Sequence, residues 1–209
     1  MEVRTLSDLL DHPKLKGRVG LLTEMRDTVG MTLLDLDKDP AKFAADDYDA
    51  AIARLQKAVD KGQVRRFTGN DYTADLTKGD LAACLAWAGD LVQLKADNPD
   101  IDFLIPDSGY LTSSDNMLIP NKARHKTNAE RLIDYYFEPK PAARLAAYIN
   151  FVCPVDGVKD ALAEIDEDAA NNPLILPDRA MQSKSRAFRS LSSEEETEFE
   201  EKFAKLTGA

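Results

Sequence analysis

Short apolar segments alternate with amphipathic helical segments in the first half of the chain, and this alternation constrains the fold more than any other feature of the sequence. Residues 15–22 (LKGRVGLL), 63–68 and 81–87 (LAACLAW) are predicted as strands. Residues 24–36 and 48–59 carry apolar side chains every three or four positions, which predicts helices. Strands joined by helices pair in parallel. The sequence therefore predicts an α/β fold with a mostly parallel sheet.

A polar, turn-rich stretch divides the chain near its middle. It spans residues 106–115 (PDSGYLTSSD) and separates two further predicted strands, at 101–105 and 116–119. After it the pattern is mainly helical. Helices are predicted at 128–137, 142–151 and 158–165, and at the C-terminus from Ser193 with Glu196 three residues later. Residues 115–157 are therefore predicted to be organised separately from the rest.

The composition disfavours several classes of protein. The chain has 27 Lys and Arg against 37 Asp and Glu, a net charge of −10, so it repels nucleic acid and favours cationic partners. Cys84 and Cys153 each lie in an apolar run, where a buried free thiol is expected. No segment has the apolar length of a membrane span, and the first residues show no signal-peptide pattern.

No arrangement of catalytic residues is evident in the sequence. His12 and His125 lie in polar, turn-like sequence, and no phosphate-binding loop, nucleophile elbow or paired-histidine metal motif is present. Ser113, Ser114 and Asp115 bring hydroxyls near an acid but lack a positioned base. We therefore predict that the protein is not an enzyme and uses no cofactor or metal.

Acidic and aromatic residues follow the predicted strands. Glu24 and Asp27 share the first turn of a helix directly after the first strand, and Trp87 ends the strand at 81–87. Open α/β sheets bind ligands at this edge, where carboxylates suit an ammonium group and an aromatic ring suits its methylenes. A structural role is also open, because acids favour helix N-termini and a single tryptophan often packs in a core.

Three segments in order resemble the spermidine/putrescine-binding proteins of bacterial ABC transporters. They are LKGRVGLLTEMRDTVGMTLL, LAACLAWAGD and IPDSGYLTSSDNMLIPNKARHKTNAERLIDYYFEPKPAARLAAYINFVCPVDGV. The resemblance covers nearly the whole chain and is most specific in DNMLIPNKARHKTNAERLIDYYFEPKPAA. It implies a periplasmic-binding-protein-like fold of type II, in which an α/β lobe has a mixed sheet flanked by helices.

The resemblance also implies how the chain is divided. Residues 1–114 and 158–209 would form the second, C-terminal ligand-binding lobe, and residues 115–157 would return to a first lobe that this chain mostly lacks. The whole protein would be a monomer in the periplasm or on the outer side of the membrane. It would close around a polyamine and deliver it to an ABC permease, and it would bind no nucleic acid. An export signal and an N-terminal lobe are then expected to be missing from this sequence.

Carried over position by position, the resemblance implies these ligand-binding residues: Glu24, Asp27, Trp87, Asp115 and Phe151. The chain departs from the family at Ser113, where a stacking tryptophan is expected, so Tyr110 is the candidate to replace that ring. The family's late glutamine has no clear counterpart near Phe188 and Arg189. These departures leave open a binding protein for another small solute. A cytosolic α/β enzyme is the alternative from a different class.

Overall fold

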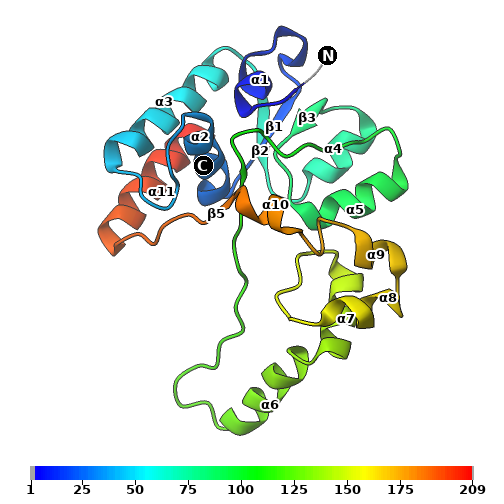
Figure 1. The fold of residues 1–209 in the computed structure, drawn as a ribbon. Helices are drawn as coiled ribbons and strands as arrows, with labels where there is room; N and C mark the ends of the chain where they lie inside the picture. The colour runs from blue at the N-terminus through cyan, green and yellow to red at the C-terminus, as the bar shows by residue number, and fades with distance from the viewer. Residues whose placement is uncertain (1–2, 209) are drawn as a thin grey trace. The chain divides into compact units, whose positions relative to one another are not determined.

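The protein, a computed structural model described over residues 3–208, divides into two compact units. Unit 1 comprises Met1–Trp87, Leu94–Ser113 and Lys184–Ala209, and unit 2 comprises Ala88–Gln93 and Ser114–Ser183. The outer limits of the predicted lobe, residues 1 and 209, lie outside the described residues. Figure 1 shows the elements of both units.

A small parallel sheet forms the centre of unit 1. Its strands, in the order β2-β1-β3, are β1 (Val19–Leu22), β2 (Val64–Thr68) and β3 (Ala83–Cys84). The connecting helices are α2 (Met25–Asp35), α3 (Ala45–Asp60) and α4 (Tyr72–Lys78). All four residues of β1 are buried, as expected of a central strand. The α/β fold is confirmed, but the described strands pair only in parallel, so the mixed sheet is wrong for them.

Several predicted strands are shorter or missing. Residues 13–15 form a 3-10 turn, η1 (Pro13–Leu15), and the predicted strand at 81–87 keeps only two paired residues. Residues 101–105 and 116–119 form no strand, because no described strand lies beside them to complete a ladder. Two unpredicted short strands, β4 (Tyr110–Leu111) and β5 (Ser185–Arg186), pair in parallel. Cys84 and Cys153 are free but only partly buried.

The core of unit 1 lies between α1 (Leu6–Asp11), α2, α3, the sheet and the C-terminal helix α11 (Ser193–Thr207). The rings of Tyr48 and Phe199 stack with centroids 3.9 Å apart, and the Tyr48 hydroxyl donates to the Phe199 carbonyl at 2.7 Å. Helix α11 is capped by Ser192, which accepts from the amide of Glu195. The N-cap predicted at Ser193 is therefore one residue too late. The run of three glutamates puts an acid three residues after either Ser192 or Ser193, so the sequence fits both caps.

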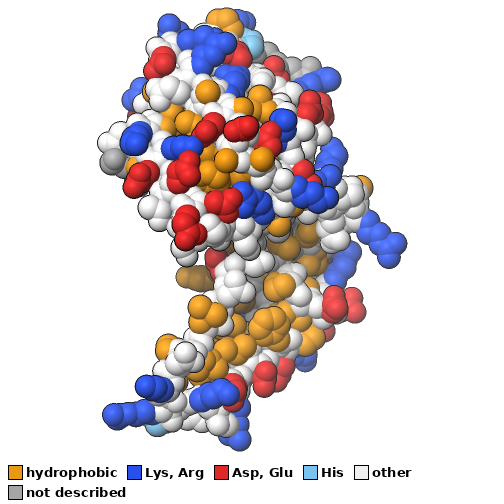
Figure 2. Space-filling view, turned by 90° about the vertical axis from the view of Figure 1, so that its left-hand side faces the viewer, with side chains coloured by type: hydrophobic (Ala, Val, Ile, Leu, Met, Phe, Trp, Pro, Cys, Tyr) orange, Lys and Arg blue, Asp and Glu red, His pale blue; other side chains and the backbone are white. Residues whose placement is uncertain are grey.

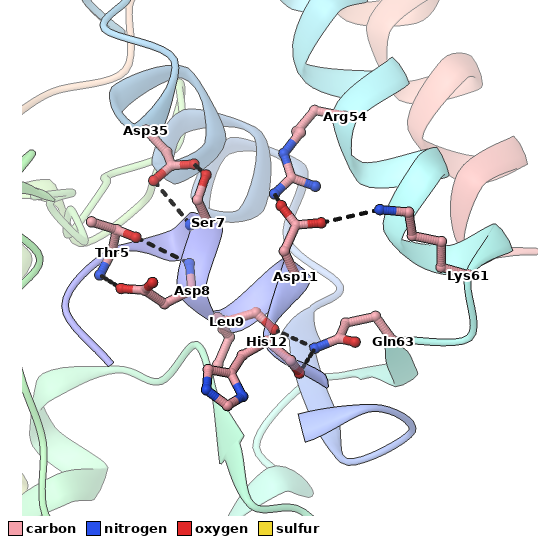
Figure 3. A network of polar contacts seen from close by, with 10 residues as sticks. All are labelled: Thr5, Ser7, Asp8, Leu9, Asp11, His12, Asp35, Arg54, Lys61 and Gln63. Atoms are coloured by element: carbon pink, nitrogen blue, oxygen red, sulfur yellow. Dashed lines mark hydrogen bonds and ion pairs between the residues drawn. The ribbon is translucent and has the colours of Figure 1, made fainter. Parts of the chain in front are cut away.

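The first helix, α1 (Leu6–Asp11), is hydrogen-bonded to Gln63, the residue just before β2 (Figure 3). The side-chain amide of Gln63, which is 4% exposed, donates to the carbonyls of Leu9 at 2.9 Å and His12 at 3.0 Å. The end of α1 leaves the Leu9 carbonyl without a helical partner, whereas the His12 carbonyl also accepts from the Leu15 amide at 3.0 Å. On the exposed side, Asp11 pairs with Arg54 at 2.6 Å. Gln63 therefore secures the end of α1 from within the fold.

We expect Gln63→Glu to destabilise unit 1 by about 3 kcal/mol near neutral pH, since a carboxylate has no donor for two buried carbonyls. The loss should shrink in acid, where a protonated carboxyl can donate one bond. Urea unfolding at two pH values measures both effects. The matched control is Gln56→Glu on the surface of α3, where Gln56 contacts only Asp60 in the bonds observed, and its cost should stay below about 0.5 kcal/mol. Equal costs in the two variants would contradict the role of Gln63.

Unit 2 is helical and has a core of its own. Its helices are α6 (Lys126–Tyr136), α7 (Pro139–Ile149), α8 (Val158–Ala163), α9 (Glu167–Asn171) and α10 (Arg179–Ser183), and α5 (Ala88–Asp97) begins in it. The core joins the small residues of α7 to residues from α8 onward: Ala142, Ala143, Ala146, Val158, Leu162, Ala169, Ala170 and Ile175. Because this core continues past Gly157, unit 2 runs to Ser183, where the predicted segment ended at residue 157.

Unit 2 also has many apolar side chains that it does not bury. Helix α6 buries none of its residues. Large exposed side chains include Leu118, Leu132, Phe137, Tyr148, Phe151 and Val152. Figure 2 shows hydrophobic side chains gathered over this part of the chain. Contiguous apolar surface of this kind usually marks a contact surface. No helix in residues 3–208 is both long enough and apolar enough to cross a membrane.

Candidate ligand-binding site

The ends of β1 and β3 bring an acid and an aromatic ring together in unit 1. Asp27 lies in the first turn of α2, just after β1, and Trp87 immediately precedes α5, shortly after β3. The indole Nε1–H of Trp87 donates to Oδ2 of Asp27 at 3.3 Å. Parallel strands end at the same edge, which is why residues so far apart in sequence meet here.

Asp27 is half-buried, and its surroundings disfavour its charge. Burial raises the pKa of the Asp27 carboxyl above its ordinary value, and the negative charge of Glu24 adds to the rise, while the hydrogen bond from Trp87 opposes it. The Asp27 carboxyl therefore takes up a proton more readily than an ordinary aspartate does, and a nearby positive charge would oppose that.

Glu24 is exposed at the start of α2 and makes no side-chain capping bond. Its Oε2 accepts instead from the hydroxyl of Thr23 at 3.1 Å. Below this turn, the buried Thr28 hydroxyl donates to the Leu22 carbonyl at 2.7 Å and fixes the start of α2 on the end of β1. Capping therefore does not account for Glu24, although its charge still favours the helix N-terminus.

Trp87 is half-buried and belongs to neither hydrophobic cluster of the described residues. Its backbone N–H donates to the Tyr72 hydroxyl at 3.1 Å, and the two rings are tilted at 55° with centroids 6.0 Å apart. The ring is therefore held at the edge of the sheet instead of filling a core.

The remaining predicted residues are divided between the units. Tyr110 lies in β4 of unit 1, which packs against α2 so closely that a Cβ on Gly30 would lie 2.4 Å from a methyl of Leu111. Asp115 and Phe151 lie in unit 2, where both are exposed. A Cβ on Gly89 would lie 2.1 Å from the Phe151 ring, so this glycine makes room for it. Within unit 1 the structure thus brings Glu24, Asp27 and Trp87 together, while Asp115 and Phe151 belong to unit 2.

Two residues beside the site were missed by the sequence reasoning. Tyr72 begins α4 and is fully buried, so in the sequence it looks like an ordinary core aromatic. Gly69 follows β2, and a Cβ there would lie 4.0 Å from the Thr23 hydroxyl, which places the end of β2 beside that of β1. For Gly69 the available signal was the rule already applied to the other strands, that residues just after parallel strands share one edge, whereas nothing in the sequence singled out Tyr72.

Two further observations on the described residues concern metal binding and the Cys84 thiol. Within residues 3–208 no group of three His, Cys, Asp or Glu side chains could hold a metal ion. Burial, with a smaller contribution from Asp75, raises the pKa of the Cys84 thiol to about 12, so this thiol stays protonated and unreactive near neutral pH.

Comparison with proteins of known structure identifies the fold. A putative spermidine/putrescine ABC transporter from Listeria monocytogenes superimposes with a TM-score of 0.83 at 21% identity, over 97% of this chain and 61% of that one. The Tp0655 (TpPotD) lipoprotein of Treponema pallidum gives a TM-score of 0.80 at 17% identity, over 100% of this chain and 63% of that one. At these identities the likeness shows the fold alone, which is that of periplasmic binding proteins.

Sequence comparison identifies the family. The putrescine-binding periplasmic protein PotF of Escherichia coli (strain K12) is 25% identical over 172 residues, 79% of this chain and 45% of that protein. Spermidine/putrescine-binding periplasmic protein 1 of Haemophilus influenzae is 25% identical over 162 residues, 77% of this chain and 44% of that protein. The chain thus spans about half the length of these curated relatives, which are binding proteins and not enzymes. Residues 2–175 match the family described as bacterial extracellular solute-binding protein, and the chain belongs to this family.

Proposed function

We propose that this protein binds a polyamine such as putrescine or spermidine and delivers it to an ABC importer. The observation that carries the proposal is the half-buried Asp27 carboxylate held against Trp87 at the end of β1, with Glu24 one turn away. The names of the relatives, which bind putrescine or spermidine, support the same class of ligand.

The proposed roles follow from the chemistry of a polyamine, which has ammonium groups joined by methylene chains. Asp27 and Glu24 would pair with an ammonium group, and each such charged hydrogen bond contributes about 1.5 to 3 kcal/mol when shielded from water. The Trp87 ring would pack on the methylenes and face the cation, which adds about 0.5 to 2 kcal/mol. Tyr110, Asp115 and Phe151 stay in the proposed set of ligand residues.

The rest of the family's fold is proposed to complete the protein. We propose that unit 1 corresponds to the second lobe and that unit 2 packs on the first lobe. The predicted segment 115–157 is extended to Ser183 because the core of unit 2 includes Leu162 and Ile175. The exposed apolar side chains of α6 and α7 support this, since a first lobe packed on that surface would cover them. We place the whole protein, as a monomer, in the periplasm or outside the membrane, with a permease as its partner.

Fluorescence of Trp87, the one tryptophan in the sequence, tests the proposal directly. Both the protein as its gene encodes it and the 209-residue chain are titrated with putrescine and spermidine, with calorimetry in parallel. We expect a saturable change in emission with both amines. Diacetylated putrescine, which keeps the methylenes but lacks the charges, should give none. Binding of another solute in the absence of any response to the amines would refute the polyamine assignment.

Asp115 is tested separately because it lies in unit 2. We expect Asp115→Ala to weaken polyamine binding more than tenfold, as loss of one charge-assisted hydrogen bond requires. Calorimetry on the protein as its gene encodes it measures the change. Asp178→Ala, also in unit 2, is the control and should bind like the wild type. Wild-type affinity in Asp115→Ala would remove Asp115 from the site.

Another small solute, such as one resembling an amino acid or a metal chelate, is the second candidate. Ser113 favours it, because a hydroxyl stands where the resemblance implies a stacking tryptophan. A hydroxyl binds polar groups better than methylenes. Competition of amino acids against a polyamine for the Trp87 signal separates the two candidates.

A further inference from the structure

Trp87 is held at two points, one on its side chain and one on its backbone. The indole N–H donates to Asp27 at 3.3 Å, and the backbone N–H donates to the Tyr72 hydroxyl at 3.1 Å. The acceptor of the first bond is the proposed ligand carboxylate. The acceptor of the second is Tyr72, which has no role in the proposed binding mechanism.

The hydrogen bond from the Trp87 amide to Tyr72 replaces the next bond of the β1–β3 ladder. The amide of Leu85 continues the pairing of β3 with β1 by donating to the Gly20 carbonyl at 3.1 Å. In a regular parallel ladder, the amide of Trp87, two residues on, would next reach the Leu22 carbonyl. That carbonyl instead accepts from the Thr28 hydroxyl at 2.7 Å, and the Trp87 amide turns to Tyr72. Tyr72 thus supplies the acceptor that ends the strand and sets the direction of Trp87.

The buried ring of Tyr72 lies at the site of Trp87 and outside the two main hydrophobic clusters. Its exposed fraction is 0%, yet it is a member of neither hydrophobic cluster among the described residues. Its ring lies beside that of Trp87, with centroids 6.0 Å apart. A buried tyrosine hydroxyl needs a hydrogen-bond partner, and the Trp87 amide is one that it has. Ring and hydroxyl therefore both act on the same residue.

We propose that Tyr72 is a positioning residue for the ligand site, which fixes Trp87 so that the indole N–H meets Asp27 and the ring is ready for the ligand. Tyr72 itself touches no ligand. Its effect on affinity rests on the proposed function, whereas its effect on Trp87 does not. Holding a binding group in place before the ligand arrives strengthens binding, because less conformational freedom is lost on association.

The test compares Tyr72→Phe with Tyr48→Phe. Both variants keep a buried ring and lose a buried hydroxyl, but the Tyr48 hydroxyl bonds the Phe199 carbonyl in the core, away from Trp87. Without ligand, we expect Tyr72→Phe to shift the Trp87 emission to the red and to increase its quenching by acrylamide. Tyr48→Phe should leave both unchanged, even where it lowers the melting temperature. With amine, Tyr72→Phe should bind about fivefold more weakly, the effect of one ordinary hydrogen bond.

Each outcome decides the proposal. Wild-type emission and quenching in Tyr72→Phe would overturn it, and so would equal changes in the two variants. If Tyr72→Phe does not fold, hydrogen exchange at the Trp87 amide of the wild type replaces it: slow exchange supports the bond to Tyr72, and free exchange overturns it. If no amine binds the wild type, the proposed function fails, while the measurements without ligand still decide the role of Tyr72.

Discussion

Asp27→Ala will bind putrescine and spermidine more than tenfold more weakly than the wild type. The substitution removes the half-buried carboxylate that accepts from Trp87, and with it the charge that would pair with an ammonium group. A tenfold loss corresponds to about 1.4 kcal/mol, less than the typical contribution of one charged hydrogen bond. Titration followed by calorimetry measures the affinity, since the emission of Trp87 will itself change in this variant.

The matched control is Asp46→Ala. Asp46 is also an acid in the first turn of a helix, α3, but it is exposed and does not follow a strand. Both variants lose the same favourable interaction with a helix dipole, about 0.3 to 1 kcal/mol, so a difference in affinity must come from the ligand site. Wild-type affinity in Asp27→Ala, or an equal loss in Asp46→Ala, would show that Asp27 does not bind the cation.

Acid should weaken binding through the same residue. Because burial and Glu24 raise the pKa of Asp27, its carboxylate takes up a proton at a higher pH than an ordinary aspartate does. A neutral carboxyl loses its attraction for an ammonium group, so affinity falls as the pH drops through this raised pKa. Bound cation opposes protonation, and the fall should therefore begin at lower pH when the ligand is in excess.

The general fold could be predicted from the sequence because its elements are periodic. The helix that became α3 has a clear apolar face, α2 has apolar residues along most of its length, and β1 is a continuous apolar run. Residues 101–105 have a similar apolar character but form no strand, since a strand also needs a neighbour with which to pair, and sequence pattern does not supply that information. The pair β4 and β5 was missed for the converse reason, because Tyr110 and Ser185 belong to polar, turn-like sequence.

The candidate site was predictable where it followed strand ends and not elsewhere. Asp27 and Trp87 could be placed together from the rule that parallel strands end at one edge, and the structure puts them in hydrogen-bond contact. Tyr72 could not, because its role depends on where the β1 and β3 ladder stops. Phe151 came only from the family resemblance, and Asp115 came from that resemblance and from its position near a predicted strand end; their place in the site stays a prediction.

The largest loss of stability is expected from Gly109→Ala, just before β4. Gly109 has φ of 103°, and a Cβ there would lie 2.4 Å from the backbone carbonyl oxygen of Lys184. Both the strained backbone and the overlap must be relieved, each at about 1 to 3 kcal/mol, so we expect a total loss of about 3 kcal/mol or more. The pairing of β4 with β5 would be disturbed first, because the amide of Tyr110 donates to that same carbonyl at 3.2 Å.

Gly79→Ala separates the two causes. Gly79 ends α4 with φ of 78°, but nothing lies within 4 Å of a Cβ placed there, so this variant bears only the backbone strain, about 1 kcal/mol. Urea unfolding followed by Trp87 emission reports on unit 1, which contains both glycines. Equal losses of unfolding free energy in the two variants would mean that overlap with the Lys184 carbonyl adds no cost at Gly109. A larger loss in Gly109→Ala would show that β4, which packs against the helix carrying Asp27, is held by backbone contact at that point.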